Sequence, residues 1–87
     1  MKCYVYILYS QSTDVYYVGA TNDVYKRLER HNSGLENFSK KHIPWELVWF
    51  TEKPNKSEAF KLEKKLKNLS KERKIKFIEK YSNTDEA

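Results

Sequence analysis

The sequence places two basic side chains beside the apolar stripe of an expected helix. Val24 and Leu28 form that stripe, and Arg27 and His31 follow at helical spacing. With about 100° of rotation per residue, His31 lies roughly 20° and Arg27 roughly 60° from Val24 around the helix axis. A guanidinium and an imidazole on this side could hold an anion. The alternative is that both lie at the edge of the core, with their polar ends in water.

A carboxylate takes the corresponding position on a second expected helix. Glu63 lies roughly 40° from Ala59 and roughly 60° from Leu66, which belong to the apolar stripe of that helix. A buried carboxylate has to be paired, protonated or bound to a cation, because an unpaired buried charge is strongly unfavourable. Glu63 is therefore either the ion-pair partner of Arg27 or a ligand of a divalent metal ion, with Arg27 nearby to hold an anion.

Two tyrosines could complete this set of residues. Tyr6 lies in the run CYVYILY and Tyr17 in the run VYYVG. If these runs pair as a hairpin with Tyr6 directly opposite Tyr17, the two side chains lie on one face of the sheet and Tyr4 lies opposite Gly19. Stacked core tyrosines are the ordinary explanation for such a pair.

Strands and helices that could position these residues are visible in the apolar pattern. Runs rich in β-branched and aromatic residues predict strands at 3–9, 15–19 and 45–50. The first two strands form a hairpin with two apolar faces, so we expect both faces to be covered.

Capping residues place the helices between and after these strands. A first helix is expected to begin at Asn22 or Asp23 and to end near Gly34, and 35–44 is expected to be a loop. Asn55 and Ser70 are expected to cap two further helices. The order strand, strand, helix, strand, helix, helix indicates an α+β fold with a three-stranded, mainly antiparallel sheet flanked by helices.

Length and composition limit the classes of protein that remain. A chain of 87 residues suits one hydrophobic core, and we expect one domain at 1–82 and a disordered tail at 83–87. The single cysteine and two histidines exclude a disulfide framework and a four-ligand zinc site within one chain, and a cytoplasmic location is the simplest expectation. No signal peptide and no run of about 20 apolar residues is found, so no membrane association is expected.

The net charge of +5 is concentrated in the second half of the sequence. Residues 53–80 contain 11 Lys and Arg and four Glu, a net charge of +7. A basic region of this kind attracts polyanions, which makes nucleic acid the leading partner and an anionic membrane the lesser one. A solvated, lysine-rich helix surface is the alternative. The residues expected to bind nucleic acid are Arg27, Arg30, Lys61, Lys64, Lys65 and Lys67.

Several of these features together resemble a known family. YVY at 4–6, YVG at 17–19, Arg27, His31 and Glu63 are similar to the motifs of the GIY-YIG nuclease family, and the resemblance covers nearly the whole chain. The segments ELVWF and SEAFKLEKKLKNLS resemble the short, stand-alone bacterial proteins of that family, whose cellular role is mostly uncharacterised.

The resemblance implies a role for each of the five residues. Tyr6 and Tyr17 are the motif tyrosines, Arg27 contacts phosphate, and His31 lies where many members have a histidine at the site. Glu63 is implied as the single carboxylate ligand of Mg²⁺ or Mn²⁺. Either a tyrosine with a lowered pKa or His31 is the candidate base.

The expected function is that of a metal-dependent endonuclease that hydrolyses DNA phosphodiester bonds. No further DNA-reading domain is visible, so we expect the protein to select DNA by its structure or to obtain its specificity from a partner protein. RNA is an open alternative substrate. The alternative is a nucleic-acid-binding module of the same fold with weak or no catalysis. Two departures from the family motif favour that alternative. Tyr4 replaces the first glycine of the motif, and Ala20 stands where some repair-type members have a lysine. An interaction module for an acidic protein is a third hypothesis.

Overall fold

The chain forms three strands and four helices in a computed structural model that describes residues 2–81, except the side chains of residues 38 and 39. Residue 82 and the tail expected at 83–87 lie outside the described residues. The elements are β1 (Cys3–Ser10), β2 (Val15–Thr21), α1 (Val24–Asn32), α2 (Asn37–Lys40), β3 (Trp45–Lys53), α3 (Lys56–Lys67) and α4 (Lys71–Tyr81). The α+β class and the order of the strands and main helices are confirmed, and α2 is a single turn within the expected loop.

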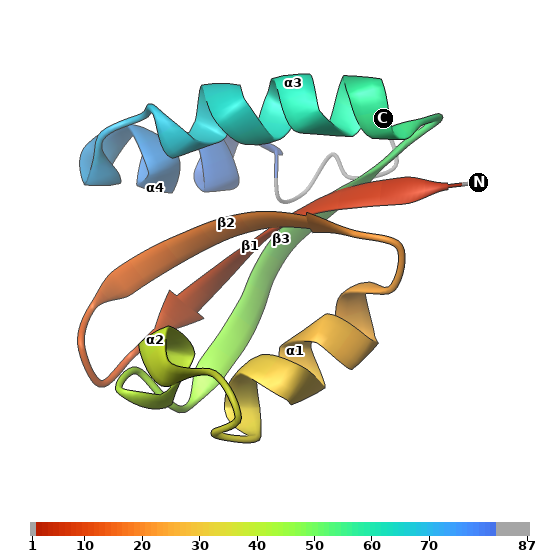
Figure 1. The fold of residues 1–87 in the computed structure, drawn as a ribbon. Coiled ribbons are helices and arrows are strands. Elements are labelled where there is room, and N and C mark those ends of the chain that lie inside the picture. The colour runs from red at the N-terminus through yellow and green to blue at the C-terminus, as the bar shows by residue number, and fades with distance from the viewer. Residues whose placement is uncertain (1, 82–87) are drawn as a thin grey trace.

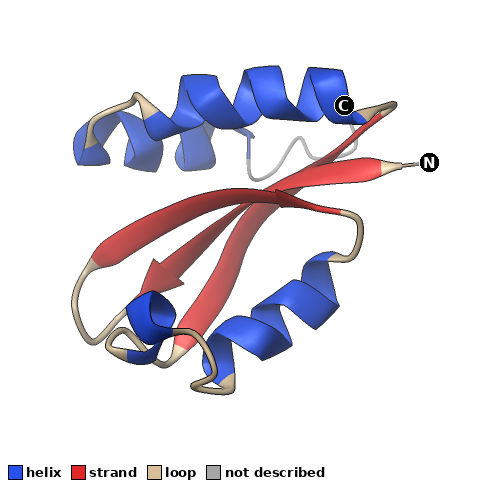
Figure 2. Ribbon diagram, viewed as in Figure 1, coloured by secondary structure: helices blue, strands red, loops and turns tan. Residues whose placement is uncertain are grey.

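The three strands form an antiparallel sheet in the order β2-β1-β3. Helix α1 lies on one face of this sheet, and α3 and α4 lie on the other (Figures 1 and 2). None of the described helices is long and apolar enough to cross a membrane.

The central strand β1 is buried on both faces, which confirms that the hairpin is covered on two sides. Val5 and Ile7 pack in the cluster that contains Leu66 of α3. Tyr6 and Leu8 point the other way, into the cluster that contains residues of α1. Because successive side chains of a strand alternate between its two faces, this strand supplies both apolar layers of the protein.

The helix caps form as the sequence indicates. The side chains of Asp23, Asn55 and Ser70 each accept a hydrogen bond from the backbone amide three residues further on, at 3.0, 2.9 and 3.2 Å. Gly34 follows α1 with a φ of 82°, a left-handed conformation that favours glycine.

The expected strand register was wrong by two residues. Gly19, and not Tyr17, lies directly opposite Tyr6, and Tyr17 lies opposite Leu8. The hairpin turn sets this register, because Asp14 adopts a φ of 57° and its amide donates a 2.7 Å hydrogen bond to the carbonyl of Ser10. A shift of two residues preserves the face of each side chain, so the rings of Tyr6 and Tyr17 still lie together, with centroids 6.2 Å apart.

The ring of Tyr6 lies directly against Gly19. A Cβ atom on residue 19 would be 2.5 Å from the Tyr6 hydroxyl oxygen and 2.6 Å from its Cζ atom. Tyr6 is almost fully buried, so its ring has little room to move. The glycine of the YVG motif is therefore required by the tyrosine of the neighbouring strand.

We predict that Gly19→Ala destabilises the protein by about 1–3 kcal/mol, because overpacking a closed core forces side chains or backbone to shift. Urea denaturation followed by circular dichroism measures this change. In a Tyr6→Leu background, which removes the ring, Gly19→Ala should cost clearly less. An equal cost in both backgrounds would show that the Tyr6 contact is not the cause.

Candidate active site

Four of the five residues singled out in the sequence meet on the α1 face of the sheet. Tyr6 comes from β1, Tyr17 from β2, and Arg27 and His31 from α1. The Tyr6 hydroxyl lies 3.3 Å from Nε2 of His31, and the ring centroids of Tyr17 and His31 are 4.9 Å apart. Arg27 and His31 are one turn apart on α1, which explains why both reach the tyrosines.

The Tyr6 hydroxyl is a protonated donor in this cluster. The Arg27 guanidinium hydrogen-bonds the Tyr6 hydroxyl. Burial raises the pKa of Tyr6 to about 12, although the hydrogen bond from Arg27 acts in the opposite direction. A phenol with that pKa is not the base at neutral pH. Because a guanidinium only donates, the hydroxyl accepts from Arg27 and can give its own proton to His31.

His31 is a neutral imidazole in the folded protein. Burial lowers its pKa, and so does the positive charge of Arg27, while the carboxylate of Glu36 acts in the opposite direction. With the Tyr6 proton directed at Nε2, the ring carries its own proton on Nδ1. That Nδ1 atom is buried and has no hydrogen-bond partner in the described part of the chain.

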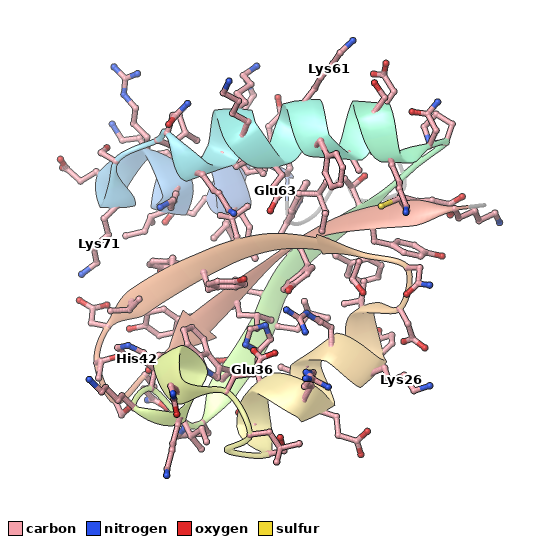
Figure 3. The ribbon with its side chains drawn as sticks, viewed as in Figure 1. Lys26, Glu36, His42, Lys61, Glu63 and Lys71 are labelled. Atoms are coloured by element: carbon pink, nitrogen blue, oxygen red, sulfur yellow. The ribbon has the colours of Figure 1, made fainter. Side chains whose placement is uncertain are left out.

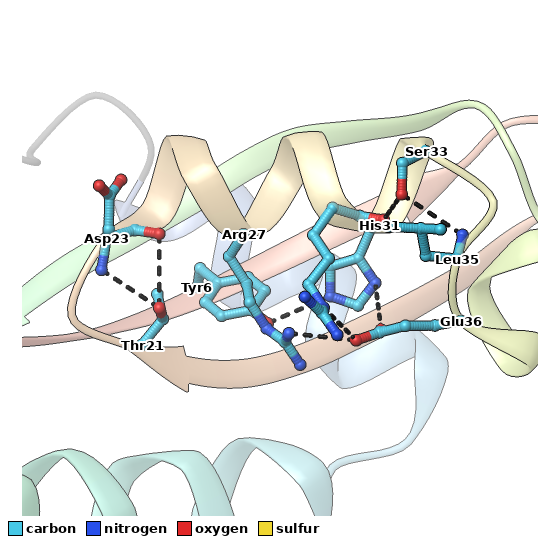
Figure 4. Close-up of polar contacts among 9 residues, drawn as sticks. Tyr6, Thr21, Asp23, Arg27, His31, Ser33, Leu35 and Glu36 are labelled. Carbon is cyan, nitrogen blue, oxygen red and sulfur yellow. Dashed lines mark hydrogen bonds and ion pairs between the residues drawn. The ribbon is translucent and has the colours of Figure 1, made fainter.

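Glu36, in the loop between α1 and α2, is the residue that the sequence analysis missed. Its Oε2 atom accepts hydrogen bonds from Nη1 of Arg27 at 3.2 Å and from Nε of Arg30 at 2.9 Å. Its Oε1 atom lies 3.8 Å from Nδ1 of His31 (Figure 4). The hydrogen bond from Arg30 and the charge of Arg27 lower the pKa of Glu36. The spacing of Arg27 and Arg30 on one helix indicates a pair of cations, but nothing local in the sequence identifies which acid reaches them.

Glu63 is not part of this cluster. It projects from α3 on the opposite side of the sheet from Glu36 (Figure 3). Its carboxylate forms an ion pair with Lys67 on the same helix at 3.0 Å. The expected Arg27–Glu63 pair was therefore wrong, because Arg27 pairs with Glu36, Glu63 pairs with Lys67, and α1 and α3 cover different faces of β1.

The metal site implied for this chain has Glu63 as its single carboxylate ligand. The described residues contain no group of three or more His, Cys, Asp or Glu side chains that could hold a metal. The carboxylate that does lie in the cluster, Glu36, already contacts two guanidinium groups, which makes it a poor cation ligand. Glu63 as a lone protein ligand remains a prediction.

A surface pocket connects the two helical layers around the end of β2. Arg27 of α1 and Lys56 and Phe60 of α3 line it, together with Lys2. Phe60 is 55% exposed. The basic side chains of the two layers are therefore linked by a cationic pocket with an exposed aromatic ring.

Comparison with known proteins identifies the family of this chain. The sequence profile described as the GIY-YIG catalytic domain matches residues 2–87. The chain belongs to the GIY-YIG family. The resemblance identified from the motifs is thus confirmed, and the family implies a nuclease-type fold.

The relatives within the GIY-YIG family are short bacterial proteins. The UPF0213 protein YazA of Bacillus subtilis is 36% identical over 73 residues, which cover 83% of this chain and 74% of that protein. The UPF0213 protein SSP2268 of Staphylococcus saprophyticus is 35% identical over 78 residues, covering 88% and 94%. The solution NMR structure of the UPF0213 protein BH0048 from Bacillus halodurans has 34% identity and a TM-score of 0.59, and covers 91% of this chain and 84% of that one.

We predict that the protein loses stability as the pH falls below about 6.5, the ordinary pKa of histidine. The unfolded chain binds a proton at His31 more readily than the folded protein, because the folded pKa is lowered, so the stabilisation is present above that pH and is lost on acidification. Thermal melts between pH 7.5 and 5.5 measure the slope. His31→Gln should flatten it, and an unchanged slope in that variant would contradict a neutral, buried His31.

Proposed function

We propose that this protein is an endonuclease that hydrolyses DNA phosphodiester bonds. The observation that carries the proposal is the convergence of Tyr6, Tyr17, Arg27 and His31 on one face of a GIY-YIG domain. A guanidinium, a phenol and an imidazole in contact with one another can bind a phosphate and control a proton beside it.

Exposure assigns different roles to the four residues. Tyr6 and His31 are about 1% exposed, so with Glu36 in place they act by positioning their neighbours. The side chain of Arg27 is 31% exposed and Tyr17 is half-buried, so these two can touch a substrate. Arg27 then stabilises the charge that develops on the non-bridging oxygens as water attacks phosphorus, and Tyr17 orients the water or the phosphate.

Tyr6 fixes the direction of Arg27 in this scheme. Its hydroxyl accepts a hydrogen bond from the guanidinium and gives its proton to His31. Arg27 is thereby held beside Tyr17 before substrate arrives, which lowers the reorganisation needed during reaction.

Dependence on Mg²⁺ or Mn²⁺ is part of the proposal because of the family, and Glu63 is the residue to test for it. A divalent ion supplies charge on phosphate oxygens and an activated water in phosphodiester hydrolysis. The roles given above follow from the contacts of Tyr6, Tyr17, Arg27 and His31 with one another and assign no ligand to the ion.

DNA is the proposed partner because cations of both layers border one pocket. Arg27, Lys2 and Lys56 line the pocket at the end of β2, and Lys61, Lys64, Lys65 and Lys67 extend along α3. Lysines on a helix neutralise phosphates and carry no base-reading geometry, so we propose selectivity for DNA structure, with RNA as the other nucleic acid to test.

The second candidate function is a nucleic-acid-binding module with weak or no catalysis. Two observations favour it: Glu63 is paired with Lys67, and Glu36 contacts both arginines of the site. Both functions require DNA binding, so only cleavage assays separate them.

We predict that the wild-type protein cleaves at least one member of a panel of single-stranded, duplex and branched DNAs in Mg²⁺ or Mn²⁺, and that EDTA stops the reaction. Arg27→Lys should lower the rate at least about 100-fold, because a lysine cannot reproduce the geometry of the guanidinium. Arg73→Lys, the same change at an exposed position of α4, is the matched control. Wild-type inactivity on the whole panel, RNA included, would favour the binding module.

We predict that Glu63→Gln removes the metal-stimulated part of cleavage and changes stability little, because the lost ion pair with Lys67 is partly exposed. Glu58→Gln, which loses a comparable pair with Lys61 on the same helix, is the control and should keep its metal response. A Mg²⁺ titration of cleavage with parallel thermal melts measures both properties. Full metal stimulation in Glu63→Gln would exclude Glu63 as the ligand.

A further inference from the structure

Glu36 lies where an anion would bind in the site. Two guanidinium groups donate to the same oxygen atom, Oε2, from Arg27 and from Arg30. The other oxygen, Oε1, faces the Nδ1 atom of His31. A carboxylate held by two guanidinium groups uses the same donors that bind a phosphate, because both anions match the planar N–H geometry of arginine.

The site offers one more donor than Glu36 uses. Nδ1 of His31 is 3.8 Å from Oε1, beyond hydrogen-bond distance, and it is buried without a partner in the described part of the chain. A buried donor without an acceptor is unfavourable. A tetrahedral phosphate has oxygens in more directions than a carboxylate, so it can meet the two guanidinium groups and the imidazole together.

There is open space beside the two arginines that hold Glu36. A surface hollow of about 580 Å³, within the size range of small-ligand sites, is lined by Arg27, Arg30 and Leu35. Leu35, next to Glu36, is 75% exposed. Gly34 has a left-handed φ of 82° and a Cβ atom there would meet no atom within 4 Å, so there is open space beside this segment.

We propose that Glu36 is an intramolecular substitute for the substrate phosphate, and that a nucleic-acid phosphate displaces it to bind Arg27, Arg30 and His31. The proposal rests on the nuclease function proposed above and adds a gate to the same site. While Glu36 is in place, it competes with every phosphate for the two arginines. A substrate must therefore gain enough contact elsewhere, for example at the lysines of α3, to open the site.

Removing the carboxylate tests this gate. Binding of a short fluorescent DNA duplex is measured by anisotropy in EDTA and low salt, so that no cleavage interferes. Glu36→Gln should bind about tenfold more tightly than wild type, because a neutral amide no longer competes for the guanidinium groups. Glu72→Gln removes the same charge from an exposed position of α4, away from the hollow, and should bind less than about twofold more tightly. Equal gains in the two variants, or no gain in Glu36→Gln, would overturn the proposal.

A measurement on the wild-type protein keeps the test independent of the variant's folding. NMR of the Arg27 and Arg30 Nε–H groups and the Glu36 amide is followed during titration with the duplex, and separately with inorganic phosphate. All three signals should shift together with the duplex. A shift with inorganic phosphate as well assigns the site to phosphate groups in general, and its absence assigns it to the nucleic-acid backbone. Duplex binding that leaves the Glu36 amide and both arginine signals unchanged would contradict displacement.

The outcome also separates this inference from the proposed activity. If Glu36→Gln binds more tightly but neither protein cleaves any nucleic acid in Mg²⁺ or Mn²⁺, the phosphate site stands and the nuclease function fails. If wild type cleaves but Glu36→Gln binds and reacts like wild type, the nuclease function stands and the gate fails.

Discussion

The contact between the buried Tyr6 hydroxyl and His31 ties the central strand to the helix that carries the arginines. Both partners are almost completely removed from solvent, so the Tyr6 hydroxyl and Nε2 of His31 have to satisfy each other inside the protein. This requirement fixes the rotation of α1 relative to β1, and with it the direction in which Arg27 points. It also explains the close approach of the Tyr6 ring to Gly19, because a ring that reaches His31 must lie across the backbone of β2.

The same contact divides the site into a buried and an exposed part. Tyr6 and His31 form the buried part, and their pKa values shift toward neutral forms. Arg27 and Arg30 remain partly exposed and carry the positive charge. A neutral interior next to a charged surface means that an anion at the arginines meets less competition from solvent than it would on an open helix face.

The sequence predicts the fold well because its signals are local. β-branched and aromatic runs specify the strands, and Asn55 and Ser70 form caps with atoms only three residues away. The register of the hairpin is less predictable, because it depends on the left-handed conformation of Asp14 in the turn. The site is predicted in part: Arg27 and His31 are identifiable from helical spacing, but the acid that meets them depends on which face of the sheet each helix covers. Nothing near Glu36 or Glu63 in the chain specifies that choice.

The position of β1 at the centre of the sheet affects how the chain folds. Residues at the start of the sequence pair with β3, whose last residue is Lys53, so the sheet is complete only after a large loop has closed. During synthesis, the β1–β2 hairpin leaves the ribosome before β3, with the edge of β1 that later pairs with β3 still unpaired and both faces apolar. An intermediate of this kind is prone to aggregate. Expression at lower temperature, or with chaperones that bind exposed strands, should therefore affect the yield of this protein more than its final stability.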